Sequence, residues 1–213
     1  MVSQLGGDKS LEVVLHLEKD DGGRYVLPAF TAGLKDHLAP ENDRAYRFAD
    51  VNNMRAETVV NLLQGRPAKV HYEAGEDIFR YKWLQLEFRA GISPKMKSFS
   101  NEFRFDPAWR LGQLAEKLGA PSLLRPKVMT LLEKGNAVYF QVPGVKERFS
   151  LEADPGGKQV LIRDSLGQVI AADSLLAQKR VAQVQYKAKV PEMNRGKSRG
   201  KGRGIGLDKS IGI

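Results

Sequence analysis

One short stretch occurs nearly twice in the chain, and this repetition limits its folds more than any other feature. The stretch 128–140 lies 69 positions after the similar stretch 59–71. Each copy has apolar residues at helical spacing, then a glycine, then an apolar-rich run; the helical positions are Val59, Leu62 and Leu63, and Val128, Leu131 and Leu132. This order is typical of a short amphipathic helix that ends at a glycine and leads into a strand. The sequence therefore predicts an internal repeat.

A second echo extends the repeat, because Leu84–Glu87 is similar to Phe149–Glu152. Each helix is thus expected to precede antiparallel strands. The predicted fold is α+β, with two tandem units of a helix plus antiparallel strands, an N-terminal β-hairpin and a disordered basic C-terminal tail. The predicted segments are a disordered N-terminus (1–10), the hairpin and a connector (11–50), the first unit (51–106), the second unit (107–187) and the tail (188–213).

The hairpin prediction rests on an apolar run from Leu11 to Leu17, followed by the turn-forming sequence Asp21-Gly22-Gly23. Pro28 has to lie at a sheet edge or end the second strand, since proline cannot donate to a ladder. Beyond it, residues 31–38 are expected to form a short helix. Residues 91–97 are polar and are expected to form a loop.

The strongest helix start is Asp106-Pro107, a capping acid followed by proline at the first helical position, and Gly119 is expected to end that helix. Pro126 then lies in the first turn of the second repeat helix. Further strands are expected at 137–142, 146–151, 159–163 and 168–171, with turns at 154–157 and 164–167. Residues 173–179 are expected to form a brief helix or a loop.

The segment 78–89 is rich in aromatic residues, and two interpretations of it are open. The aromatic residues of this region and just after it are Phe79, Tyr81, Trp83, Phe99, Phe103, Phe105 and Trp109; basic residues alternate with several of them. An exposed sheet of this composition would stack nucleic-acid bases. A half-buried strand with aromatic residues inside and charges outside has the same pattern, and we favour it. The apolar phase also changes near Trp83, which indicates a bulge there or a strand covered on both faces.

The positive charge is concentrated near the C-terminus. The net charge is +9, and from Lys179 onward ten basic residues stand against two acidic ones, so the rest of the chain is nearly neutral. Five of these cations alternate with glycine or serine: Arg195, Lys197, Arg199, Lys201 and Arg203. A flexible segment of this kind can follow a phosphate backbone without reading its sequence. These five residues are the predicted nucleic-acid-binding site; the alternative is a solvated tail that only aids solubility.

Catalytic and metal-binding patterns are missing from the sequence. The three histidines (His16, His37, His71) are scattered, and the chain contains no cysteine. No nucleophile elbow or phosphate-binding glycine loop occurs. Glu87 and Glu152 occupy similar repeat positions but have no third group that would make them an acid–base pair. We therefore predict a protein that is not an enzyme and that needs no cofactor or metal.

The sequence also bears on location. The first ten residues are polar and do not resemble a signal peptide. No uncharged apolar run reaches the roughly 18 residues of a membrane span. The absence of cysteine fits a reducing compartment. We expect a soluble, cytoplasmic protein without membrane contact.

Several segments together resemble a family of uncharacterised proteins from conjugative and mobilisable elements of Bacteroidetes. A region of this kind also occurs appended to topoisomerase-like proteins. The resembling segments are Ala56–Arg66, Tyr81–Phe88, Phe105–Leu111, Leu131–Asn136, Leu151–Pro155 and Gly200–Ile205. The resemblance implies a role in DNA transfer or in maintenance of a mobile element. It supplies no catalytic residues, and the chain shows no topoisomerase portion, so strand cleavage is not implied.

Two functions are favoured by these observations, and an enzyme of unknown type is a third alternative, because the absence of a motif is weak evidence. In the first, the chain is a non-enzymatic accessory protein of a mobile genetic element. Its basic tail binds nucleic acid, with DNA expected, nonspecifically, and its folded body docks a DNA-processing or transfer protein. In the second, the chain is a protein–protein interaction module that recruits a partner by strand addition and does not bind nucleic acid. The sequence leaves the oligomeric state open.

Overall fold

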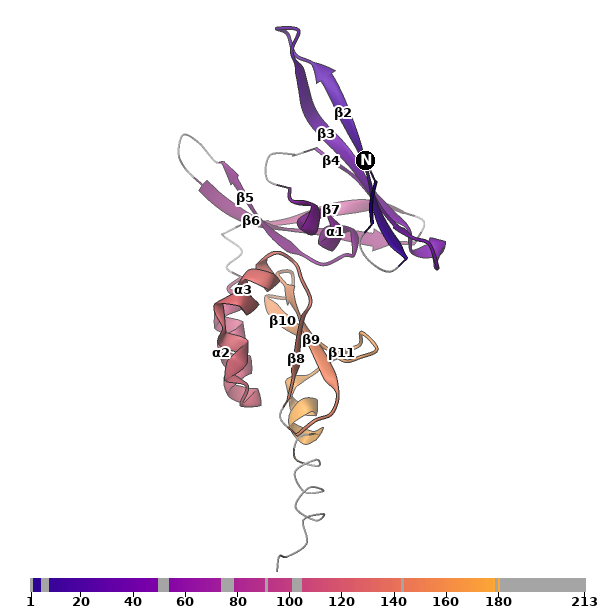
Figure 1. The fold of residues 1–213 in the computed structure, drawn as a ribbon. Helices are drawn as coiled ribbons and strands as arrows, with labels where there is room; N and C mark the ends of the chain where they lie inside the picture. The colour runs from indigo at the N-terminus through magenta and orange to yellow at the C-terminus, as the bar shows by residue number, and fades with distance from the viewer. Residues whose placement is uncertain are drawn as a thin grey trace, which may run out of the picture.

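The computed structural model describes residues 2–4, 8–49, 54–73, 79–90, 92–100, 105–142, 144–178 and 180. Over these residues the protein is a mixed α+β structure with three antiparallel sheets, which confirms the α+β class of the prediction. Figure 1 shows the N-terminal sheet and the middle sheet in one half of the molecule and the C-terminal sheet, flanked by helices, in the other.

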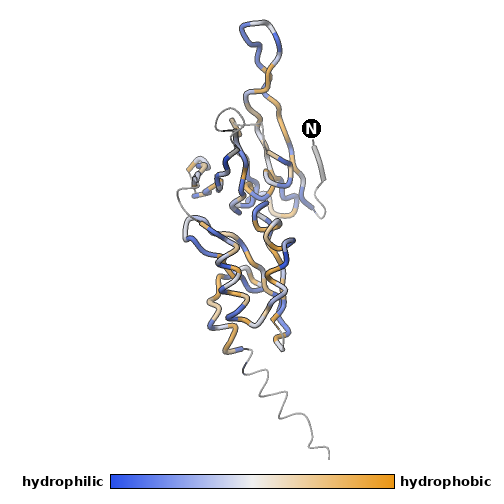
Figure 2. Tube along the Cα trace, turned by 90° about the vertical axis from the view of Figure 1, so that its left-hand side faces the viewer, coloured by the Kyte–Doolittle hydropathy of each residue, from blue (hydrophilic) through white to orange (hydrophobic). Residues whose placement is uncertain are grey.

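The N-terminal sheet has a long two-stranded arm. Its strands, in spatial order, are β1 (Val2–Gln4), β2 (Lys9–Lys19), β3 (Tyr25–Asp36) and β4 (Arg44–Phe48). β2 and β3 pair antiparallel and project beyond the rest of the sheet (Figure 1). In Figure 2 this arm has apolar residues along its strands and hydrophilic residues at its tip.

The helix predicted at residues 31–38 is wrong, because residues 31–36 belong to β3. β3 pairs with β2 on one side and with β4 on the other, which satisfies its backbone groups in a ladder. Phe30, Ala32 and Leu34 are buried with a period of two. Tertiary pairing has therefore overridden the local pattern.

Residues near the start of the chain pair with this sheet. β1 pairs with residues 10–12 of β2, so the prediction that residues 1–10 are disordered is wrong for Val2–Gln4 and for residues 9 and 10.

Pro28 lies in β3 beside a register shift between His16 and Glu18. It also lies outside the stretch of β3 that pairs with β4. Pro28 thus occupies a local edge, as a residue without an N–H requires.

The middle sheet follows a short helix. The elements are α1 (Ala56–Leu63), β5 (Ala68–Glu73), β6 (Phe79–Arg89) and β7 (Ile92–Ser100). The loop predicted at 91–97 is wrong for residues 92–97, because they form β7 and pair with β6. The polarity of β7 reflects its partners and its edge position, since Lys95 and Lys97 stand opposite Glu87 and Gln85. Gly91 lies outside the described residues.

β6 is covered on both faces, which decides between the two explanations of its aromatic phase change. Leu84 and Leu86 are buried in the core shared with the N-terminal sheet, whereas Trp83 packs on the other side with Phe105 and Ala153. The pairing of β6 is continuous at Trp83, and its register shift lies between Glu87 and Arg89.

The C-terminal half agrees closely with the sequence prediction. Its elements are α2 (Pro107–Leu118), a 3-10 helix (Pro121–Leu124), α3 (Pro126–Glu133), β8 (Val138–Gln141), β9 (Arg148–Asp154), β10 (Gln159–Arg163), β11 (Val169–Ile170) and a helix at 172–178. The Asp106 carboxylate caps α2 by accepting from the backbone N–H groups of Ala108 and Trp109. Gly119 ends α2 with a φ of 60°.

The segments around α1 and α3 share two local backbone features. α1 and α3 each span eight residues, and each is followed by a glycine with positive φ, 80° at Gly65 and 86° at Gly135. The structural correspondence is 70 positions, one more than the sequence alignment indicates. The sheets that follow differ, since one has three strands and the other four.

Two hydrophobic cores hold the described residues together. The first combines residues of the N-terminal sheet, α1 and the middle sheet, so the predicted segments 11–50 and 51–106 share one core. The second contains residues of α2, α3 and the C-terminal sheet. A small cluster of Trp83, Phe105 and Ala153 lies between them.

Candidate nucleic-acid interface

The predicted nucleic-acid-binding residues lie outside the described part of the chain. Arg195, Lys197, Arg199, Lys201 and Arg203 all follow residue 180, the last one described. Their assignment therefore stays a prediction. The folded body offers its own candidates, which are found by following its charged side chains.

The aromatic residues of the middle sheet do not form an exposed stacking surface where the structure describes them. Trp83 is 2% exposed and Phe105 is 7% exposed, and their rings pack edge to face at 5.2 Å. Phe99 packs against the same cluster. The half-buried interpretation holds for these three residues. The side chains of Phe79 and Phe103 lie outside the described residues.

Arg66 connects the two halves of the molecule. It follows the glycine after α1, and its Nε donates to the carbonyl oxygen of Gly135, 2.8 Å away. Its Nη2 donates to the side-chain oxygens of Asn61 and Gln64. Burial lowers the pKa of the Arg66 guanidinium, which Glu152 and Tyr139 partly oppose. An arginine stays charged under such a shift, so Arg66 places a fixed positive charge between the halves.

Gly135 makes this contact sterically tight. A Cβ atom at this position would lie 2.8 Å from the carbonyl oxygen of Pro67 and 3.1 Å from the Cβ of Asn61. Asn61 also donates from Nδ2 to the carbonyl oxygen of Lys134, at 2.8 Å. The loops after α1 and α3 therefore dock directly on each other. We call this contact the junction.

Ion pairs surround the junction. Lys69 Nζ lies 2.7 Å from Glu133 Oε1, and Lys134 Nζ lies 3.1 Å from Glu57 Oε2. Asn136 donates to the Glu57 carboxylate, and this hydrogen bond is the main cause of the lowered pKa of Glu57. Each pair joins one half of the molecule to the other.

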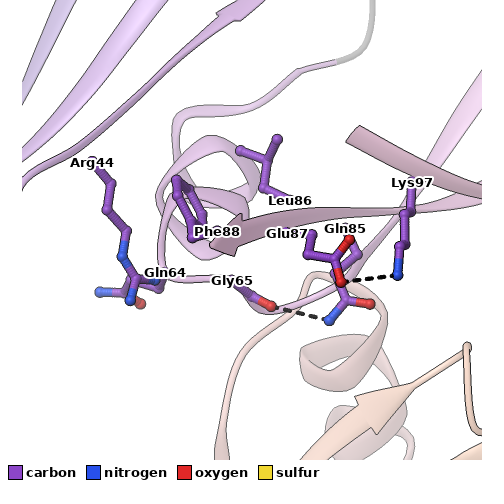
Figure 3. Close-up of a pocket in the computed structure, with 8 residues that line it drawn as sticks. All are labelled: Arg44, Gln64, Gly65, Gln85, Leu86, Glu87, Phe88 and Lys97. Atoms are coloured by element: carbon purple, nitrogen blue, oxygen red, sulfur yellow. Dashed lines mark hydrogen bonds and ion pairs between the residues drawn. The ribbon is translucent and has the colours of Figure 1, made fainter. Parts of the chain in front are cut away.

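The charged groups that line a polar cleft beside the junction bond to other groups of the protein (Figure 3). The cleft is lined by Arg44, Gln64, Gly65, Gln85, Leu86, Glu87, Phe88 and Lys97. Glu87 accepts from Arg89 and Lys97, and these hydrogen bonds lower its pKa. Arg44 donates to the carbonyl oxygen of Leu63 and lies over the Phe88 ring. The charged side chains that line this cleft thus have partners within the protein.

A second cavity, of about 380 Å³, lies between the junction and the outward face of the C-terminal sheet. It is lined by Arg66, Ala137, Tyr139, Arg148, Ser150, Glu152, Arg163, Asp164, Ser165 and Gly167. Three of these residues are arginines, so we call it the arginine pocket. Tyr139 and Glu152 alternate along their strands with the buried Val138 and Leu151, which places them on the face away from the core.

The acceptors of the arginine pocket are already used by the protein. Glu152 accepts from Arg163 Nε at 2.7 Å. Asp164 accepts from the backbone N–H groups of Leu166 and Gln168 within its own turn. Arg148, in contrast, forms no ion pair within the described part of the chain, and its guanidinium lies 4.8 Å from the centroid of the Tyr139 ring. Donors are therefore in excess, which favours an anionic ligand.

Sequence reasoning missed this pocket because its arginines are far apart in the chain. Arg66 follows a helix stop, and Arg148 and Arg163 lie on neighbouring strands with ordinary alternation. A weak signal was available: outward positions of β9 and β10 include arginine beside serine and glutamate. Only the tertiary contact between Arg66 and Gly135 brings the third guanidinium to this face.

Comparison with known proteins gives no match to a family model, to a curated protein or to a solved structure. Among the described residues, no helix has the length and apolar character needed to cross a bilayer. The same residues contain no group of three or more acidic, histidine or cysteine side chains placed to hold a metal ion.

Proposed function

We propose that this chain is a non-enzymatic, nucleic-acid-binding accessory protein of a mobile genetic element. Its C-terminal segment supplies nonspecific affinity for nucleic acid, with DNA expected, and its folded body docks a DNA-processing partner in the cytoplasm. The observation that carries the proposal is the charge distribution: almost all of the net charge of +9 lies from Lys179 onward. The resemblance to proteins of conjugative elements supplies the biological context.

A second candidate is a protein–protein interaction module, favoured by the arm of β2 and β3. β1 pairs only with residues 10–12 of β2, so in the described structure residues 14–19 form an unpaired edge. Leu15 and Leu17 on this arm are 56% and 60% exposed. An exposed edge with apolar side chains is suited to strand addition by a partner.

Binding measurements across a salt series separate the two candidates. The full chain is compared with a full-length variant in which Arg195, Lys197, Arg199, Lys201 and Arg203 are replaced by glutamine. Five phosphate contacts predict a slope of about −4 to −5 for log affinity against log salt on duplex DNA. We expect the variant to lose most of this slope. Equal binding by both proteins contradicts the tail assignment, and no binding by either favours the interaction module.

We propose that the α1–β5 and α3–β8 segments descend from one duplicated unit and that the N-terminal hairpin was added to it. The equal helix lengths and the matching positive-φ glycines support this.

A further inference from the structure

We propose that the arginine pocket is a phosphate-binding site for a single-stranded nucleic acid, located on the folded body and separate from the basic tail. The inference rests on the proposed nucleic-acid function for the source of the phosphate. The site itself is built from described residues alone.

Two of the three guanidinium groups are held in place by the protein. Arg163 donates from Nε to Glu152 and from Nη1 to the carbonyl oxygen of Gly167, at 2.7 and 2.8 Å. Arg66 is held by Gly135, Asn61 and Gln64. Each guanidinium keeps one terminal nitrogen, Nη2 of Arg163 and Nη1 of Arg66, that has no protein acceptor among the described residues. Because the side chains are already fixed, little rotamer freedom is lost when a ligand binds.

The chemistry of the lining selects an oxyanion with several acceptor oxygens. Arg66, Arg148 and Arg163 provide charged donors, and the hydroxyl of Ser150, a residue only 8% exposed, adds a neutral one. Both lining carboxylates are engaged within the protein. Guanidinium groups match the geometry of phosphate oxygens, and charge-assisted bonds of this kind are stronger than neutral ones. A phosphate group offers several acceptor oxygens to these donors.

The surroundings of the pocket favour a single strand over a duplex. Tyr139 is 63% exposed on the outward face of the C-terminal sheet, at the rim of the pocket. An exposed aromatic ring on a sheet offers a stacking partner to an unpaired base. Arg148 already lies against this ring, so one side chain can contact both the base platform and the phosphate. Bases within a duplex are stacked on one another and cannot use such a ring.

The test measures binding of a 5′-phosphorylated thymidine trinucleotide to the full-length protein in which the five tail cations are replaced by glutamine. The probe carries its dye at the 3′ end, and the same oligonucleotide without the 5′-phosphate is the reference. Arg148→Gln is the decisive variant, because Arg148 is exposed and forms no ion pair among the described residues. Arg110→Gln is the charge control: Arg110 also lies over an aromatic ring, that of Trp109, and its loss removes the same charge away from the pocket, together with its hydrogen bonds to the carbonyl oxygen of Lys158 and to Gln113.

We expect Arg148→Gln to weaken binding of the phosphorylated probe about tenfold, the effect of one lost charge-assisted contact. Arg148→Lys should recover only part of the loss, because a lysine lacks the planar fork. The control should bind as the parent does. Equal losses in Arg148→Gln and Arg110→Gln would mean that only overall charge matters and would overturn the proposal.

The remaining outcomes separate this proposal from the proposed function. Binding of inorganic phosphate, with no added affinity for the trinucleotide, would assign the pocket to a free phosphate compound and overturn the nucleic-acid source. A pocket that binds the trinucleotide in a protein whose tail variant shows no change in salt slope would sustain this inference and reject the tail. Loss of tail binding with an inactive pocket would do the reverse.

Discussion

At the residue scale, Gly135 shows why a single position can fix the arrangement of two cores. Its φ of 86° is unfavourable for other residues, and its Cα faces the carbonyl oxygen of Pro67 closely enough that a Cβ would lie 2.8 Å from that atom. Gly135 also supplies the carbonyl oxygen that holds Arg66. One glycine therefore combines a helix stop, a close backbone approach and a contact of the arginine pocket.

Gly135→Ala should be more destabilising than backbone strain alone explains. A left-handed residue with a Cβ costs about 1–2 kcal/mol, and the clash with Pro67 adds to it. The matched control is Gly144→Ala, because Gly144 has the same φ of 86° and a Cβ there would meet no atom within 4 Å. Urea unfolding of both variants isolates the clash. Equal losses of unfolding free energy would show that the junction is not tight at this point.

Glu57 gives the junction a dependence on acid. Its pKa is lowered, mainly by the hydrogen bond from Asn136 and then by Lys134. A lowered folded-state pKa means that the stabilisation is complete above the unfolded-state value, about 4.3, and is lost as the pH falls through the lower folded-state value. Glu57 is partly exposed, so the effect is well below about 1 kcal/mol. Unfolding free energies of the parent and of Glu57→Gln should converge as the pH falls from 6 to 3; parallel curves would contradict this.

At the element scale, the sequence predicted best those elements whose first and last residues are themselves capping or stop residues. α2 has a capping aspartate, a proline at its first position and a left-handed glycine at its end, and both of its bounds were predictable. β3 and β7 were misjudged, because their strand character comes from partners that lie elsewhere in the chain. The arginine pocket was out of reach for the same reason. Its residues come from the loop after α1, from β8, β9 and β10 and from the loops that flank these strands, and no local pattern marks their convergence.

The N-cap of α2 offers a direct check of this local logic. Asp106→Ala removes the acceptor for the N–H groups of Ala108 and Trp109 and should lower the unfolding free energy by about 1 kcal/mol. Asp106→Asn retains an acceptor and should lose much less. Thermal unfolding followed by circular dichroism compares the three proteins. An unchanged midpoint in Asp106→Ala would show that packing of Leu111 and Leu118 alone determines where the helix begins.

At the scale of the whole molecule, two separate cores are joined by polar contacts and one small aromatic cluster. Asn61 is central to that connection. Asn61 is a buried residue, only 2% exposed, and its side chain forms hydrogen bonds with Lys134, Asn136 and Arg66. Cooperative unfolding of the two halves then depends on the junction rather than on a continuous hydrophobic core.

Asn61→Ala should therefore uncouple the halves. The substitution leaves an Arg66 donor and the Lys134 carbonyl without their partner, which costs about 2–4 kcal/mol in total. Trp83 reports on this event, because its indole is buried in the cluster between the cores. In the parent protein, Trp83 fluorescence and far-ultraviolet circular dichroism should follow one urea transition. In Asn61→Ala the fluorescence change should precede the loss of circular dichroism. Trp109→Phe, made in both proteins, removes the second tryptophan signal. Coincident transitions in the variant would show that the cluster of Trp83, Phe105 and Ala153 holds the two halves together without the polar junction.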